Sequence, residues 1–138
     1  MPSLQRPAPA RRLRVLLALS LPLWLMACAS APKGPASVSE VMERPAERNL
    51  LAGLRSYEDA RYTDAEKSLK EALRLQLSSP RDQASAHKTL AFIYCTSNRM
   101  ADCEAAFRAA RAADPQFQLS KAEAGHPVWG PVYERSRR

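Results

Sequence analysis

The sequence predicts an all-α protein: two helix hairpins and a C-terminal capping helix, behind a cleaved signal peptide and a flexible tether. Three observations lead to this prediction. From residue 46 onward the apolar residues recur with helical spacing, and no alternating β-branched run occurs. Capping and stop residues divide that stretch into short helices. Residues 11–28 combine a basic patch, an apolar run and a cysteine, which is the pattern of a secretory leader.

Residues 1–27 are predicted to form a lipoprotein signal peptide. Residues 11–14 supply three arginines, and residues 15–26 form an apolar run of the expected length, about 7–15 residues. The run is too short for a transmembrane helix, which needs about 20 apolar residues, and Pro22 interrupts it. It ends in Leu25-Met26-Ala27-Cys28, which resembles the lipobox of bacterial lipoproteins. The alternative is an ordinary signal peptide with an accidental cysteine.

The lipobox resemblance implies that a diacylglycerol is attached to the thiol of Cys28 and that a peptidase cuts just before it. The lipid would then anchor the chain to a membrane, with no other cofactor expected. Ala29 follows the cysteine. Enterobacterial lipoproteins kept in the inner membrane have aspartate there, so we expect the periplasmic face of the outer membrane.

Removing the leader changes the charge argument. The whole chain carries 21 basic and 14 acidic residues, a net charge of +7 that suggests nucleic-acid binding. Four of the basic residues and none of the acidic ones precede Cys28, so the mature chain has 17 basic residues against 14 acidic. This is an ordinary surface, and no nucleic-acid partner is expected. The 111 mature residues suffice for one domain with a modest core.

Residues 28–45 are predicted to comprise the lipidated cysteine and a flexible linker. Proline, alanine, serine and glycine dominate this stretch, and few of its side chains favour packing. The linker would let the folded domain lie clear of the membrane.

Four antiparallel helices are predicted near residues 46–60, 64–77, 80–97 and 101–113. Thr63 with Glu66 and Ser120 with Glu123 have capping-box spacing, and Ser79 precedes a proline at the first helical position. Stops are predicted at Asp114-Pro115 and at Gly125-His126-Pro127.

The four helices read as two copies of one unit. Aligning Ala65 with Cys103 also aligns Gly53 with Ala91, and the same shift of 38 residues places Leu69 on Phe107 and Ala72 on Ala110. This arrangement resembles the tetratricopeptide repeat, in which small residues let two helices approach closely. The period exceeds the usual 34 residues of that family by four. Residues 46–119 are thus expected to hold two tetratricopeptide-like repeats, the alternative being an unrelated pair of helical hairpins.

Residues 120–138 are predicted to cap the second repeat. Two repeats leave an apolar face uncovered, since about three are needed for independent stability. Trp129, Val132 and Tyr133 have the spacing of one face of a short helix that begins after Pro127. The alternative is that Trp129 and Tyr133 form an exposed partner-binding patch.

Cys95 and Cys103 remain after Cys28 is assigned to lipid. They lie at nearly equal distances from the turn at Asn98, so an antiparallel hairpin brings them close. Three interpretations of this cysteine pair are open: a disulfide, two buried thiols, or a metal or redox role. No cysteine or histidine spacing typical of zinc occurs, so no metal is expected.

No catalytic motif stands out. A phosphate-binding glycine loop and a serine nucleophile elbow are both absent from the sequence, and we read His87 and His126 as solvated or hydrogen-bonded side chains. We therefore expect no enzyme activity and no small-molecule substrate. In tetratricopeptide arrays the first helix of each repeat lines a peptide-binding groove. The resemblance maps that groove onto six residues: Leu50, Leu54, Tyr57, Glu58, Lys88 and Phe92.

Two stretches sharpen the resemblance. Residues 87–95, HKTLAFIYC, and residues 124–133, AGHPVWGPVY, together with the lipobox and the size, resemble small tetratricopeptide lipoproteins of bacterial type VI secretion systems (the TssQ type). The resemblance implies an accessory role beside an envelope protein partner. Two alternative functions are a pilotin-like lipoprotein of another envelope assembly and a regulator of cell-wall enzymes.

Overall fold

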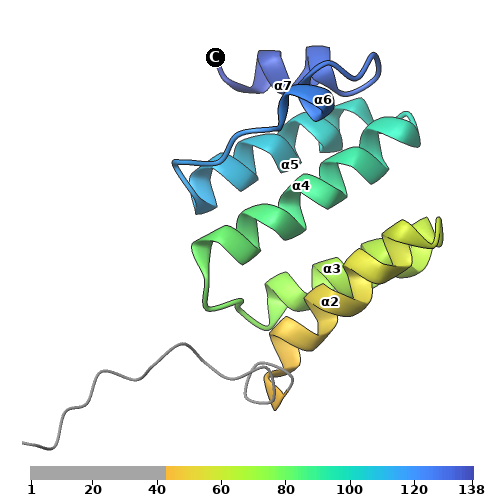
Figure 1. The fold of residues 1–138 in the computed structure, drawn as a ribbon, viewed down its shortest axis with the longest axis vertical. Coiled ribbons are helices and arrows are strands. Elements are labelled where there is room, and N and C mark those ends of the chain that lie inside the picture. Colours follow the sequence, from red (N-terminus) through yellow and green to blue (C-terminus); the bar gives the residue numbers. More distant parts are fainter. Residues whose placement is uncertain (1–42) are drawn as a thin grey trace, which may run out of the picture. The chain divides into compact units, whose positions relative to one another are not determined.

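The computed structural model describes residues 43–138, and this part of the chain contains six α-helices and no strand (Figure 1). The predicted all-α class is confirmed. The predicted signal peptide, Cys28 and the linker up to residue 42 lie outside the described residues. The helices are α2 (Pro45–Glu58), α3 (Tyr62–Arg74), α4 (Pro80–Thr96), α5 (Met100–Ala113), α6 (Lys121–Ala124) and α7 (Gly130–Ser136).

The helices form two hairpins and a C-terminal cap, as predicted. Helix α2 pairs with α3, and α4 pairs with α5. The hairpins meet mainly through α3 and α4, and α7 packs on α5 (Figure 1). No described helix is long and apolar enough to cross a membrane.

The residues matched by the 38-residue shift occupy matching places in the core. Ala65 and Cys103 are both fully buried, and so are the pairs Leu69–Phe107 and Ala72–Ala110. Gly53 shows why a small residue is required on α2: an added Cβ atom there would lie 2.7 Å from Cγ of Leu69. The two helices of the first hairpin are therefore in direct contact at this glycine.

The repeat extends to the backbone of the turns. Ala60 and Asn98, 38 residues apart, both adopt left-handed φ angles, 58° and 61°. The residue after each donates its N–H to a carbonyl five residues back, Arg61 to Ser56 and Arg99 to Tyr94, at 2.8 Å in both cases. The same two arginines each bind an aspartate three residues on. The two turns thus share one structure, which the sequence alignment did not reveal.

Two of the three predicted helix starts are confirmed. The Ser79 hydroxyl accepts the N–H of Asp82, and Ser120 and Glu123 form a complete capping box. The predicted box at Thr63 is wrong, because α3 begins at Tyr62 after Arg61 and no side chain caps it. The carboxylate that the box required, Glu66, binds Lys70 and Arg99 instead.

Two helices end earlier than predicted. Helix α2 ends at Glu58 rather than near residue 60, and α3 ends at Arg74 rather than near residue 77. Ala60 and Gln76 have φ angles of 58° and 61°, which a right-handed helix does not accommodate.

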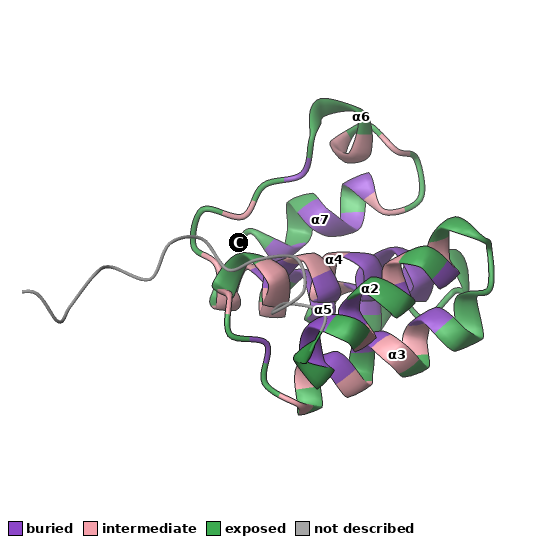
Figure 2. Cartoon of the chain, turned by 60° about the horizontal axis from the view of Figure 1, so that its bottom comes forward, coloured by how far each residue is buried: buried purple, intermediate pink, exposed green. Residues whose placement is uncertain are grey.

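The tail divides into a buried part and an exposed part. Val132 and Tyr133 on α7 are 3% and 4% exposed, and the Tyr133 ring lies 5.3 Å from that of Phe107. Its hydroxyl accepts the N–H of Leu119 at 3.4 Å. Helix α6, in contrast, contains no buried residue and is drawn exposed or intermediate in Figure 2. Helix α7 is therefore the cap, and α6 belongs to the segment that leads to it.

Candidate partner-binding surface

Four aromatic side chains form a row that joins both hairpins and the tail. The ring of Tyr62 on α3 lies 5.7 Å from that of Tyr57 on α2, and Tyr57 lies 6.4 Å from Phe92 on α4. Phe92 stacks on Trp129, the residue before α7, at 4.4 Å. We call Tyr62, Tyr57, Phe92 and Trp129 the aromatic row. It is open at one end, where Tyr62 is 48% exposed, and buried in the middle, where Phe92 is 5% exposed.

Helical spacing explains the positions of Tyr57 and Phe92. Tyr57 is one turn beyond Leu54 on the apolar stripe of α2, and both pack against the core. Phe92 is one turn beyond Lys88 on α4, so the Lys88 ammonium lies 5.7 Å from the centre of the Phe92 ring. The row thus carries a cation beside its buried ring.

Trp129 is enclosed between two rings. One face lies on Phe92, and the other lies on His126, with the ring centres 3.3 Å apart and the planes within 3° of parallel. The indole N–H donates to the Glu123 carbonyl at 2.8 Å. The His126 Nδ1 accepts the N–H of Val128 at 3.2 Å. These contacts close the chain between α6 and α7 into a compact turn around the tryptophan.

An ion pair joins this turn to α4. The Lys88 ammonium lies 2.7 Å from the Glu123 carboxylate, and both side chains are 28% exposed. Burial alone would raise the pKa of Glu123, but the Lys88 ammonium and the hydrogen bonds from Ser120 lower it below 4.5. The pKa of Tyr57 is raised, first by burial and then by the neighbouring Tyr62 and Glu123. Glu123 therefore contacts α4, and its charge acts on the Tyr57 hydroxyl of α2.

The six predicted groove residues fall into four groups. Leu50 and Phe92 belong to the core, each 5% exposed, while Leu54 and Tyr57 are partly buried against it. Glu58 is exposed to solvent. Lys88, which we expected to meet a partner's carboxylate, binds Glu123 of its own chain. The prediction of an open groove thus needs correction at Leu50, Lys88 and Phe92, which core packing or the tail already engages.

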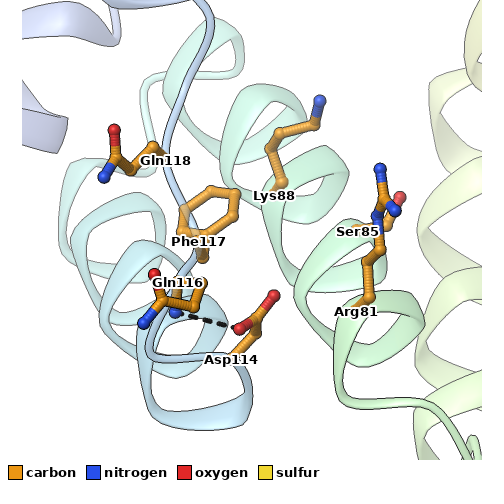
Figure 3. A pocket seen from close by; sticks show the side chains of 7 residues that line it. All are labelled: Arg81, Ser85, Lys88, Asp114, Gln116, Phe117 and Gln118. Carbon is orange, nitrogen blue, oxygen red and sulfur yellow. Dashed lines mark hydrogen bonds between the residues drawn. The ribbon is translucent and has the colours of Figure 1, made fainter.

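A polar cavity of about 530 Å³ adjoins Lys88 (Figure 3). Arg81, Ser85 and Lys88 follow one face of α4 on one side of it, and the chain after α5 closes the other side with Phe117. In that segment the Asp114 carboxylate accepts the N–H of Gln116 at 2.9 Å. The cavity gives solvent and ligands a route to α4 beside the ion pair.

A second charged cluster ties the hairpins together. The Arg99 guanidinium lies 4.2 Å from the centre of the Tyr94 ring and binds Glu66 and Asp102, both at 2.9 Å. Burial alone would raise the pKa of Glu66, but hydrogen bonds from Lys70 and Arg99 lower it. Because every member is already paired, we read this cluster as a structural contact between α3 and the turn after α4.

Cys95 and Cys103 are joined by a disulfide in the structure, with Cα atoms 5.2 Å apart. Both residues are buried, at 2% and 0% exposure. His87 lies partly buried on α4, and burial lowers its pKa. Within residues 43–138 no group of three or more histidine, cysteine or acidic side chains is placed to hold a metal ion.

Comparison with known proteins gives no match: no family model, no curated protein and no solved structure matches this chain. The surface therefore has to be interpreted from its own geometry. Sequence reasoning placed Tyr57, Lys88 and Phe92 on one surface, but it missed that Glu123 and His126 belong there as well. The capping box that contains Glu123 was recognised, yet nothing local indicates that its carboxylate reaches α4, 35 residues away.

Proposed function

We propose that this chain is a non-enzymatic lipoprotein of the outer membrane whose helical domain binds a protein partner in the periplasm, as an accessory of a type VI secretion apparatus. The aromatic row is the observation that carries the binding proposal. The lipobox at Cys28 and the motifs in residues 87–95 and 124–133 support the location and the type of assembly.

The aromatic row suits protein recognition for a physical reason. Tyrosine and tryptophan supply large apolar contact area together with a hydrogen-bonding group, and they are enriched where proteins meet. Tyr62 is 48% exposed and its ring lies 5.7 Å from that of the half-buried Tyr57, so apolar surface is available beside Tyr57. A partner helix or extended segment laid across α2 and α4 would cover these side chains.

The lipid supports binding by concentrating the chain near its partner. A surface built on only two hairpins is short, so we expect modest affinity in free solution. Anchoring both molecules to one membrane raises the effective concentration and offsets that weakness. A linker of residues 28–45 would let the domain reach a partner that stands away from the bilayer.

An in-cell crosslink followed by affinity purification tests the proposal. Wild-type protein is compared with Tyr57→Ala and Tyr62→Ala, and the co-purifying proteins are identified by mass. Met100→Ala is the matched control, because Met100 occupies the place of Tyr62 in the second hairpin, is 40% exposed and lies outside the aromatic row. We expect type VI components with wild type and with the control, and reduced recovery with both tyrosine variants.

Other outcomes overturn parts of the proposal. Recovery of secretin subunits would favour a pilotin-like role, and recovery of peptidoglycan synthases or hydrolases would favour a regulator of cell-wall enzymes. Equal recovery with all variants would remove the aromatic row from the interface. If Cys28→Ser leaves the protein on membranes, the lipid anchor is wrong.

A further inference from the structure

We infer that residues 120–129 occupy the partner-binding surface as an internal ligand, and that the partner is a protein segment presenting a carboxylate and an aromatic side chain in the same arrangement. This inference rests on the proposed function and adds to it the chemistry of the partner. We call residues 120–129 the arm.

The arm places two side chains on the predicted groove. Glu123 binds the Lys88 ammonium at 2.7 Å, and Trp129 stacks on the Phe92 ring at 4.4 Å. The tetratricopeptide resemblance maps both contacted residues, Lys88 and Phe92, to the partner-binding groove. The arm therefore supplies in one chain the acidic and aromatic contacts that an external ligand would make.

The arm is held more weakly than the cap that follows it. Helix α6 buries no residue, whereas α7 buries Gly130, Val132, Tyr133 and Ser136. Figure 2 shows the same contrast in burial, with buried residues along α7 and only exposed or intermediate residues on α6, which contacts α4 through Glu123. The arm is thus able to leave the surface while Tyr133 keeps α7 docked on Phe107.

The side chains that the arm contacts indicate the chemistry of the partner segment that would replace it. A single ammonium beside an aromatic ring selects one carboxylate, with the apolar part of the ligand stacked on that ring. In the arm these two groups are six residues apart, and the indole N–H closes the turn on the Glu123 carbonyl at 2.8 Å. A partner segment with glutamate and tryptophan six residues apart reproduces this geometry.

Tethering makes the arm an effective competitor. An internal segment joined by a short linker acts at an effective concentration in the millimolar range, so an external segment of equal intrinsic affinity binds the closed form poorly. Opening the arm should therefore raise the affinity for such a segment by at least about tenfold.

A labelled peptide tests the inference. The probe is a fluorescein-labelled peptide of residues 118–130, QLSKAEAGHPVWG, and the protein is the full chain with Glu123→Ala and Trp129→Ala, here called the open variant. We expect the open variant to bind the peptide at least about tenfold more tightly than wild type. Adding Lys88→Glu should abolish binding, and a peptide with lysine in place of Glu123 should restore it. Circular dichroism checks that each variant is folded.

A measurement on the intact arm covers the case in which the open variant does not fold. Trp24 lies in the predicted signal peptide, so Trp129 is the single tryptophan of the predicted mature chain; with Trp24→Phe it is also the single tryptophan of the full chain and reports its own environment. A saturating concentration of the peptide with phenylalanine in place of Trp129 should shift the emission to longer wavelength, as the tryptophan leaves the stack. If the emission wavelength does not shift at saturation, the inference is overturned. It is also overturned if wild type and the open variant bind the peptide with equal affinity, or if Lys88→Glu leaves that affinity unchanged.

The crosslinking experiment separates this inference from the proposed function. Greater recovery of partner with the open variant supports both. Equal recovery with wild type and open variant overturns the internal ligand and leaves the proposed function standing. If peptide binding follows Lys88 but no partner is recovered with either protein, the proposed function fails while the internal ligand stands.

Discussion

Lys88 and Glu123, which are 35 residues apart in the sequence, form an ion pair whose Nζ and Oε1 atoms lie 2.7 Å apart. The pair joins the first helix of the second hairpin to the chain that follows the second hairpin. Each side chain is only 28% exposed, so solvent screens the pair less than a fully exposed one. It holds Glu123 on α4, six residues before the Trp129 that stacks on Phe92.

Acid should release the arm. The pKa of Glu123 is lower in the folded protein than its ordinary 4.5, so the unfolded chain binds the proton more tightly. The contribution of Glu123 to stability is present above 4.5 and is lost as pH falls through the lowered pKa. In the Trp24→Phe chain we expect Trp129 emission to shift to longer wavelength in that range. Glu123→Gln should remove this transition; an identical titration in both proteins would contradict the assignment.

The two aromatic residues of the tail should differ in their effect on stability. Tyr133→Ala removes a 4% exposed side chain from the contact with Phe107 and should cost about 3–5 kcal/mol. Trp129→Ala, at the half-buried arm, should cost less than half as much. Truncation after Gly125 removes both and should melt the domain. Urea unfolding measures all three, and a truncated chain with unchanged thermal stability would show that α7 is not a cap.

Gly53→Ala should destabilise the first hairpin. Alanine ordinarily favours a helix over glycine by about 0.5–1 kcal/mol, but here its Cβ would lie 2.7 Å from Cγ of Leu69. We expect a net loss of about 1–3 kcal/mol in the free energy of unfolding. Leu69→Ala makes room for the methyl group that Gly53→Ala adds. The double variant should therefore lose less unfolding free energy than the two single variants lose together. Simple additivity would mean that the helices do not touch there.

Ala60→Gly should stabilise the protein. Ala60 has a φ of 58°, and this left-handed conformation costs an alanine about 1–2 kcal/mol that glycine avoids. We expect a gain of about 1 kcal/mol, reduced by the greater freedom of glycine in the unfolded chain. Ala105→Gly, at an exposed site within α5, should instead lose about 0.5–1 kcal/mol. Equal losses at both sites would argue against the left-handed turn.

The disulfide between Cys95 and Cys103 should be detectable and should stabilise the second hairpin. Intact mass without reductant should be lower than the reduced mass by two hydrogen atoms. The cysteines are eight residues apart, and closing so short a loop should contribute about 2–3 kcal/mol. Reductant should therefore lower the unfolding midpoint of wild type and leave the Cys95→Ala, Cys103→Ala double variant unchanged. Two free thiols in the unreduced protein would refute the bond.

Local signals in the sequence were reliable where the interacting groups are close along the chain. The caps at Ser79 and Ser120 each depend on atoms three residues away, and both form. The cap at Thr63 did not form because α3 begins one residue before Thr63, at Tyr62 after Arg61. The Glu66 carboxylate that the motif requires binds Lys70, four residues on, and Arg99, which is 33 residues from Glu66. The sequence of α3 alone contains no sign of that arginine.

The candidate site likewise has contacts that the sequence predicted and contacts that it did not. The face shared by Tyr57, Lys88 and Phe92 was expected from the tetratricopeptide resemblance. The occupation of that face by Glu123 and Trp129 depends on the path of the chain after α5, which is irregular between Asp114 and Ser120. Periodicity carries no information on such a path, so the contacts of Glu123 and Trp129 with α4 became visible only in three dimensions.

The disulfide makes the two hairpins mechanically unequal. A force pulling the described domain from its two ends acts on α2 and α3 through noncovalent contacts such as that between Gly53 and Leu69. The second hairpin is closed covalently at its turn, so residues 96–102 cannot lengthen while the bond between Cys95 and Cys103 holds. Under tension the first hairpin would extend fully, and the second would keep a closed loop at its tip.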